Sequence, residues 1–296
     1  METSLPRVRG LVVSERAFRR LTLGTVAMLV VIVVSGATVR LTGSGLGCEH
    51  WPGCSAGDPL PTNGFHGDME FSNRIVSGVA VVVVLALWLG SLLAASAPRW
   101  VRWTAGAMFL LTLGEAPLGA ITVHYHLNPW LVGTHFLLAI AVLGLGVLIA
   151  VDAWHLQSAP VPWGIQSIAL LGLVSCAVLV VTGTLATGAG PHSGSVIVPR
   201  IWSLHPAVWL HVRATAVFGV GLALVVAWLV RHRNGNLRYA VPILAVLLVQ
   251  MAIGEIQYRS KLPWGLVLVH VTLASLLWAS VVAFTVMLMR PSRMAR

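Results

Sequence analysis

The chain has 296 residues, of which 57% are hydrophobic and only 9% are Asp, Glu, Lys or Arg. Soluble domains of this size are usually about a quarter charged, so the composition excludes a soluble enzyme and a disordered chain. The net charge of +10 comes from short loops between apolar runs, so no basic face is available to nucleic acid. Long apolar runs also exclude a β-barrel of short alternating strands. The sequence therefore predicts an all-α integral membrane protein in a lipid bilayer.

Eight apolar runs predict eight transmembrane helices. A membrane-spanning helix needs roughly 20 apolar residues, so eight helices would use nearly all the hydrophobic residues of this chain. The predicted spans lie near residues 21–39, 75–95, 104–123, 130–151, 164–187, 207–230, 240–257 and 265–289.

The distribution of basic residues predicts the orientation of these helices. With the N-terminus inside, all but six of the 19 Lys and Arg residues fall on the cytoplasmic side, as the positive-inside rule requires. The six on the outer side are Arg40, Arg74, Arg200, Arg213, Arg259 and Lys261. We therefore expect a multi-pass protein of the plasma membrane with both termini cytoplasmic and the Cys48–Cys54 loop outside. The basic stretch to Arg20 is expected to be a cytoplasmic lead-in rather than a signal peptide.

The chain also contains an internal repeat of four spans. Three short matches recur in the same order: Val33–Gly36 with Val180–Gly183, Leu118–Ile121 with Ile253–Ile256, and Pro129, Trp130 and His135 with Pro263, Trp264 and His270. An even number of spans gives a parallel repeat, related by an axis along the membrane normal. This predicts two parallel-repeat four-helix bundles, in residues 1–157 and 158–296, whose interiors are the usual place for a cofactor.

Three histidines lie within spans, where ionisable groups are costly and are functional candidates. His135, His211 and His270 all fall a turn or two inside the outer ends of their spans. Taken alone, each histidine could equally be a packed polar residue that bonds a neighbouring helix. Together, His211 and His270 are predicted to face each other across the second bundle as an axial pair for haem iron. Zinc is the weaker interpretation, because no nearby Cys or carboxylate completes four ligands.

The first bundle differs from the second at one of these positions. Aligning the repeats places Asn73 where the second bundle has His211. An amide is a poor haem ligand, so a haem held by His135 would keep an open or weakly filled face. An open face suits oxygen or substrate chemistry, whereas a six-coordinate haem mainly transfers electrons.

Further polar residues near the outer end leave alternatives open. Cys48 and Cys54 are expected to form a disulfide, either structural or redox-active. Glu70 either handles protons or orients a bound group, or is a solvated loop carboxylate. Glu115, inside the third span, is a candidate proton relay, although its repeat equivalent Gln250 suggests that hydrogen bonding could suffice.

With these residues identified, the chain resembles the haem A synthase family, called CtaA in bacteria and related to the mitochondrial enzyme. The resemblance covers essentially the whole chain. It rests on Gly36–Cys48, Trp51–Cys54, Glu70–Arg74, Leu118–Ala120, His135, His211 and His270. The Gly-Ser-Gly-x-Gly-Cys segment that ends the first span is its most specific part.

The resemblance implies that the C8 methyl group of haem O is oxidised to the formyl group of haem A, for use by terminal oxidases. It implies a haem b bound by His211 and His270 in the second bundle. In the first bundle it implies that His135 holds the substrate haem, with Glu70 catalytic and Asn73 and Arg74 beside it. The mechanism predicted is successive hydroxylation of the methyl group, followed by loss of water from a geminal diol.

This chain differs from the family pattern at two places, and the resemblance also suggests partners. The family often has His where this chain has Asn73, and one bacterial form has a second cysteine pair where this chain has Gly190–Gly194. A haem O synthase and an electron donor are the expected partners, and a homo-oligomer stays open.

Two other classes of protein remain as alternatives. One is a b-type membrane cytochrome that passes electrons between quinol and the outer cysteine pair, which would need two six-coordinate haems. The other is a membrane transporter, which would show broken helices at the midplane of the membrane.

Overall fold

The computed structural model describes residues 13–48, 50–51, 53–55, 57, 60–61, 64–192, 194 and 200–290. Residues 1–12, which make up most of the predicted cytoplasmic lead-in, lie outside the described residues, as does Pro52 of the Trp51–Cys54 motif.

The described residues form eight α-helices. Their bounds are α1 (Glu15–Leu41), α2 (Gly64–Leu93), α3 (Arg99–His124), α4 (Pro129–Ala153), α5 (Trp163–Ala189), α6 (Leu204–Arg231), α7 (Leu237–Arg259) and α8 (Trp264–Met289). Each is long and apolar enough to cross a membrane. A helix suits the bilayer interior because it satisfies its backbone hydrogen bonds within one segment. The prediction of an all-α, eight-span, multi-pass membrane protein is confirmed.

Helix α2 departs furthest from its predicted start. It begins at Gly64, whereas its apolar run suggested a start near residue 75. Its first three turns are polar, so they carry no hydropathy signal. They are nevertheless helical because Glu70 and Arg74 lie one turn apart on one face and pair with each other. Glu70, Asn73 and Arg74 therefore project from a helix.

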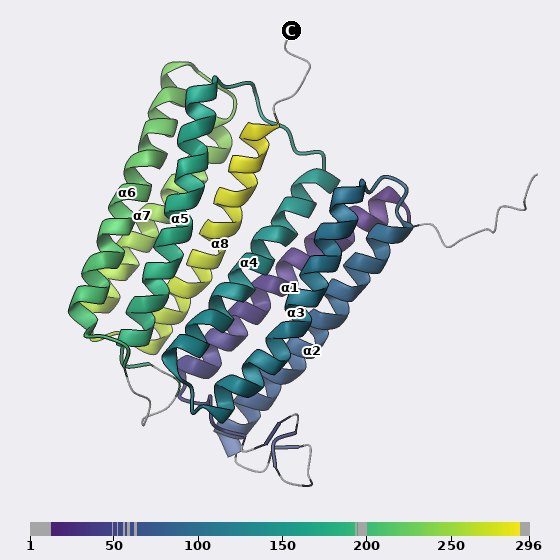
Figure 1. Cartoon of the computed structure of the whole chain (residues 1–296). Coiled ribbons are helices and arrows are strands. Elements are labelled where there is room, and N and C mark those ends of the chain that lie inside the picture. The colour runs from purple at the N-terminus through teal and green to yellow at the C-terminus, as the bar shows by residue number, and fades with distance from the viewer. Residues whose placement is uncertain are drawn as a thin grey trace, which may run out of the picture.

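The helices pack as two closed rings of four. In the first half α1 to α4 each contact their chain neighbours, and α4 returns to α1; in the second half α5 to α8 do the same. Among the described residues, diagonal helices such as α6 and α8 do not contact each other. The two halves meet where α8 packs against α1 and α4, and α5 against α4 (Figure 1). The predicted two four-helix halves are thus observed.

The two ends of this assembly differ. Helix α1 begins and α8 ends at one end, here called the terminal end, and the Cys48–Cys54 disulfide lies at the other, here called the disulfide end (Figure 1). The α2–α3, α4–α5 and α6–α7 connections lie at the terminal end. An internal proline does not interrupt α3 or α7, so the broken helices expected of a transporter are absent from the described spans.

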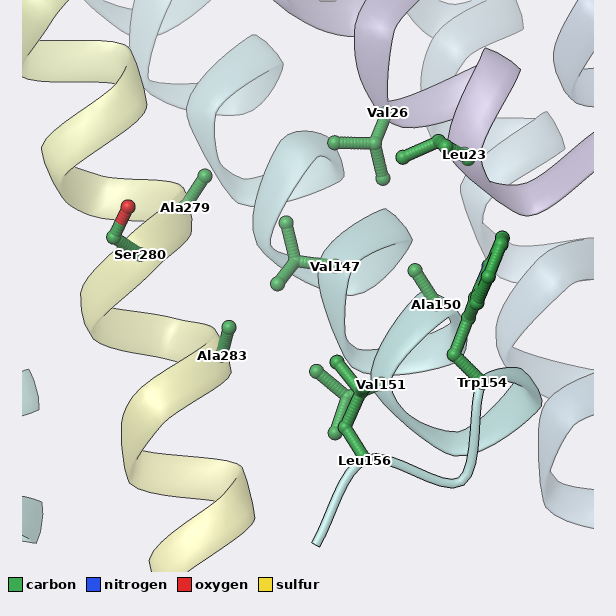
Figure 2. Close-up of a pocket in the computed structure, with 10 residues that line it drawn as sticks. All are labelled: Leu23, Val26, Val147, Ala150, Val151, Trp154, Leu156, Ala279, Ser280 and Ala283. Atoms are coloured by element: carbon green, nitrogen blue, oxygen red, sulfur yellow. The ribbon is translucent and has the colours of Figure 1, made fainter. Parts of the chain in front are cut away.

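A cavity of about 380 Å³ lies at the junction of the halves near the terminal end. Figure 2 shows the short side chains of Ala279 and Ala283 on α8 opposite Val147 and Val151 on α4. The side chains that line this cavity include no titratable group. Its lining is almost wholly apolar and comes from α1, α4 and α8.

Candidate functional site

Each half has its packed apolar core near the terminal end. The first core is built on side chains such as Val84 and Leu143, both with no exposed surface, and the second on Phe218 and Leu229. All four lie in the parts of their helices nearer the terminal end. The polar residues singled out by the sequence lie in the opposite part of each half, toward the disulfide end. Each ring of helices therefore has a filled half and a half lined by polar groups.

His211 and His270 face each other across the second half from the diagonal helices α6 and α8. Their ring centroids are 6.4 Å apart and the rings are inclined at 71°. A metal–imidazole nitrogen bond is about 2.0–2.1 Å, so two imidazoles on opposite sides of one ion place their centroids roughly 6 Å apart. The observed separation fits a haem iron held between the two rings.

Neighbouring helices orient these two rings. The Thr182 hydroxyl on α5 lies 3.2 Å from Nδ1 of His211, which leaves Nε2 of that ring for a metal. The Gln250 amide on α7 donates to the backbone carbonyl of His270 over 3.0 Å, while Nδ1 of His270 has no hydrogen-bond partner among the described groups. Both rings are thus backed by neutral groups only.

Glycines on the adjacent helices make room for these side chains. A Cβ atom on Gly183 would lie 3.0 Å from Cε1 of His211, and one on Gly254 would lie 3.5 Å from Cε1 of His270. Any larger residue at Gly183 would push the His211 ring from its place. The glycines therefore act as a cradle for the imidazoles.

The first half has the same cradle around different side chains. Gly36 faces the Asn73 side chain, with its Cβ position 4.0 Å from Oδ1, and Gly119 faces His135, with its Cβ position 3.7 Å from Cε1. These glycines are the repeat equivalents of those in the second half. Asn73 therefore occupies in the first half the place that His211 occupies in the second, as the sequence alignment predicted. Asn73 and His135 lie on the diagonal helices α2 and α4.

The structure brings Glu115 to His135, which the sequence analysis did not anticipate. Oε2 of Glu115 on α3 lies 2.5 Å from Nδ1 of His135 on α4. The two groups face each other without the alignment of a full hydrogen bond. The His135 side chain is 41% exposed and that of Glu115 only 16%. The internal repeat could have indicated this pair, since Gln250, the repeat equivalent of Glu115, lies beside His270.

Several buried polar atoms in these two regions have no hydrogen-bond partner among the described groups. In the first half they belong to Asn73, Glu115 and His135, and in the second to Gln250 and His270. An unsatisfied buried polar atom costs about 1–3 kcal/mol. Their concentration around the two sets of rings fits interiors that are built for a bound polar-edged group rather than for helix packing alone.

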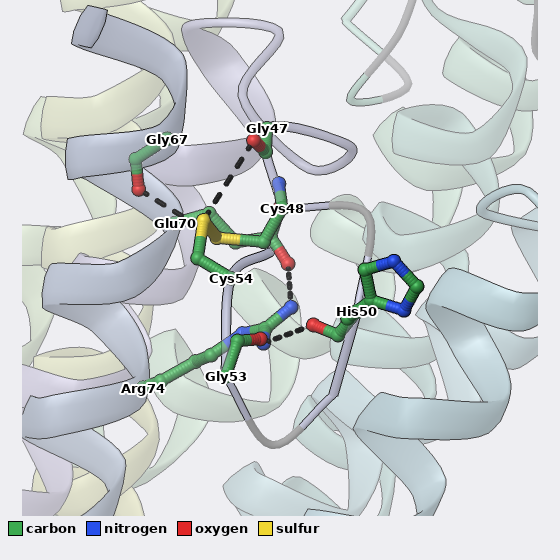
Figure 3. Close-up of a disulfide and its surroundings, with 8 residues drawn as sticks. All are labelled: Gly47, Cys48, His50, Gly53, Cys54, Gly67, Glu70 and Arg74. Atoms are coloured by element: carbon green, nitrogen blue, oxygen red, sulfur yellow. Dashed lines mark hydrogen bonds and ion pairs between the residues drawn. A yellow bond between two sulfur atoms is a disulfide. The ribbon is translucent and has the colours of Figure 1, made fainter. Parts of the chain in front are cut away.

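Glu70 and Arg74 hold the disulfide-bearing loop between α1 and α2 (Figure 3). Glu70 accepts a 2.9 Å hydrogen bond from the backbone N–H of Cys48 through Oε2 and pairs with Arg74 at 2.5 Å through Oε1. Arg74 donates to the backbone carbonyls of His50 at 2.7 Å and Gly53 at 2.5 Å. Only 5% of the surface of Glu70 is exposed. The alternative of a solvated loop carboxylate is therefore wrong.

The predicted disulfide between Cys48 and Cys54 is present. Cys48 is 1% exposed and Cys54 is not exposed at all. Because thiol–disulfide exchange needs a thiolate to reach a sulfur atom, an external thiol can react only after the loop opens. The ion pair of Glu70 and Arg74 thus helps to hold the loop that carries the disulfide.

A second set of contacts joins the two halves at the disulfide end. Arg40 at the end of α1 donates to the backbone carbonyl of His192 over 2.9 Å. His192 in turn contacts the backbone carbonyl of Leu262, between α7 and α8, through Nε2 at 2.6 Å. The Arg40 bond joins the first half to the second, and the His192–Leu262 contact ties two connections of the second half together. Sequence reasoning could not find them, because they join loops distant in the chain.

Gly47 is where the loop passes closest to α2, and we expect Gly47→Ala to loosen the loop. The added Cβ would lie 2.2 Å from the backbone oxygen of His66, which cannot move without displacing the helix. Overpacking of this kind costs about 1–3 kcal/mol, so reduction of the disulfide should accelerate about tenfold, since 1.4 kcal/mol is a factor of ten. Maleimide labelling after mild reductant measures this rate.

Gly78→Ala is the matched control, because Gly78 lies in α2 and its Cβ would have nothing within 4 Å. Equal labelling rates in Gly47→Ala and the unmodified chain would show that the loop does not depend on this close approach.

Comparison with known proteins gives a consistent result. The chain matches the COX15-CtaA family, described as "Cytochrome oxidase assembly protein", over residues 19–282. A protein named "Heme A synthase" from Alkalihalophilus pseudofirmus is 26% identical over 89% of this chain and 95% of its own length. Another of that name, from Symbiobacterium thermophilum, is 27% identical over 81% of this chain and 85% of its own length. A Thermus thermophilus protein named "Protoheme IX farnesyltransferase" is 30% identical over 86% of this chain but only 46% of its own length.

Proposed function

Since the chain belongs to the COX15-CtaA family of haem A synthases, a family of membrane oxidoreductases that act on haem, we propose that it oxidises the C8 methyl group of haem O to the formyl group of haem A. The observation that carries this proposal is the contrast between the two halves. One half has two facing imidazoles 6.4 Å apart, and the other has a single imidazole, His135, opposite an amide.

The second half, residues 158–296, is the proposed electron-transfer half. Here His211 and His270 would hold haem b, and the contact of the Thr182 hydroxyl with Nδ1 of His211 would leave Nε2 of that ring for the iron. Haem b held by two histidines is six-coordinate and supplies electron transfer. The bond from Arg40 to the backbone carbonyl of His192 links this half to the first.

The first half, residues 1–157, is the proposed substrate half. His135 would hold the iron of haem O, with Asn73 opposite and Arg74 at the mouth. Because an amide oxygen binds iron weakly, this side stays open for oxygen chemistry. Glu70 is placed to orient the substrate edge or to handle a proton, and its ion pair with Arg74 closes the mouth under the disulfide loop.

The chemical change itself is a stepwise oxidation of the substrate. Two successive hydroxylations of the C8 methyl group, each of which adds one oxygen atom and removes two electrons with dioxygen as the external oxidant, give a geminal diol, which loses water to leave the formyl group. A site that excludes bulk water protects such intermediates, which is the role we assign to the covering loop and its buried disulfide.

We also propose the orientation and the partners. The excess of basic residues at the terminal end supports cytoplasmic termini, with the disulfide end outside. A haem O synthase is the proposed source of substrate. The Thermus thermophilus relative supports this pairing, because that protein carries the name of a protohaem farnesyltransferase while this chain aligns with less than half of it.

The test is to express the full chain in a host that makes haem O but no haem A, and to separate the extracted haems by chromatography. We expect haem A to appear, and the same host with an empty vector to lack it. Bound haem b without haem A would replace this proposal by the electron-carrier alternative. A purified chain with no haem of any kind would favour the transporter.

A further inference from the structure

The three intramembrane histidines differ in what faces their Nδ1 atoms. His135 faces the carboxylate of Glu115 at 2.5 Å. His211 faces the hydroxyl of Thr182 at 3.2 Å, and Nδ1 of His270 has no partner among the described groups. Only the histidine of the proposed substrate half is thus backed by an acidic group.

The repeat shows that this difference belongs to the first half specifically. Glu115 and Gln250 both lie four residues before the glycine that faces the histidine, Gly119 in α3 and Gly254 in α7. In the second half the Gln250 amide reaches past the ring to the backbone carbonyl of His270. In the first half the Glu115 carboxylate points at the ring itself. The side chain at this repeat position therefore contacts the histidine backbone in the second half and the histidine ring in the first half.

The difference between Glu115 and Gln250 occurs together with the difference between Asn73 and His211. The half that has Asn73 in place of a second imidazole is the half that has a carboxylate behind the first. An imidazole that donates its Nδ1–H to a carboxylate is fixed in one tautomer and orientation, and it becomes a more basic ligand through Nε2. One ligand strengthened in this way can hold an iron whose opposite face is left open.

We propose that Glu115 is a positioning residue for His135, which it holds with Nε2 toward the iron of the substrate haem and makes a stronger donor than His211 or His270. This inference rests on the proposed function, because it takes the first half to bind haem O. It differs from a proton relay at Glu115, since the carboxylate has its effect through the His135 ring and needs no path to solvent.

The experiment uses the full chain, purified from the haem O-producing host in reduced form, and compares the unmodified protein with Glu115→Gln. Glutamine is the residue that the chain itself has at position 250, so this variant is expected to fold. Resonance Raman spectroscopy reads the iron–histidine stretching band, which only a haem with one histidine ligand gives. It therefore reports on His135 and not on the pair in the second half.

We expect the iron–histidine band to fall in frequency in Glu115→Gln and to recover in part in Glu115→Asp, which keeps a carboxylate. The midpoint potential of the same haem should rise, because a less basic ligand stabilises the oxidised iron less. Haem A formation should fall about 10- to 100-fold, as is typical when the partner of a ligating histidine is lost. Gly114→Ala is the matched control, because Gly114 precedes Glu115 on α3 and an added Cβ there would have nothing within 4 Å, and it should leave the band unchanged.

The outcomes separate this inference from the proposed function. A haem A-forming protein whose band and potential are the same in Glu115→Gln would overturn the role of Glu115 alone. Loss of haem A with an unchanged band would assign Glu115 to proton transfer instead. An unmodified protein that shows neither the band nor haem A would overturn both the inference and the proposed function.

Discussion

His270→Ala is expected to abolish the six-coordinate haem of the second half. The two imidazoles are the only ring ligands that face each other among the described residues, with centroids 6.4 Å apart. Removal of one leaves a buried cavity on α8 and a single imidazole on α6, and a bis-histidine haem then loses half of its protein ligands. The low-spin Soret band and the haem b content of the purified protein should both fall to background.

His205→Ala is the control for this result. His205 lies in α6 like His211, but it is exposed, and its Nδ1 lies 3.3 Å from the hydroxyl of Tyr258. Its replacement should leave the haem b content unchanged. If His270→Ala retained a full complement of low-spin haem, the axial pair would have to be sought elsewhere in the chain.

His135→Ala is expected to stop haem A formation while the haem of the second half stays bound. His135 is the single imidazole that the first half directs into its polar interior, and Asn73 opposite cannot replace it as a ligand. Loss of an outer partner of a ligating histidine already costs 10- to 100-fold, so loss of the ligand itself should cost at least about 100-fold. Chromatography of extracted haems gives the product, and the Soret band gives the retained haem b.

The combination of these two readouts makes the prediction specific. A variant that has lost both haem A and haem b would indicate a folding defect rather than a missing ligand. Haem A formation at the normal rate in His135→Ala and in Glu70→Ala would contradict the assignment of the first half as the substrate site.

The fold could be predicted from the sequence because the membrane leaves few choices. Backbone groups in a bilayer must be satisfied within each segment, so every long apolar run has to become a helix. The repeat then predicted two bundles and placed His211 and His270 on facing helices, since the period carries residues to equivalent positions. Helix α2 departed furthest from the predicted spans, because its first turns from Gly64 to Asn73 give no sustained hydropathy signal.

The contacts that distinguish the two halves were decided by the tertiary structure. The pairing of Glu115 with His135 depends on how α3 and α4 are rotated about their axes, and a span prediction does not include that rotation. Glu70 and Arg74 bond the disulfide loop, and Arg40 bonds His192, which contacts Leu262. These residues are far apart in the sequence, so the sequence does not predict that they meet. The sequence by itself thus determined the eight helices, the duplication and the three intramembrane histidines. Packing decided which of those histidines is backed by a carboxylate.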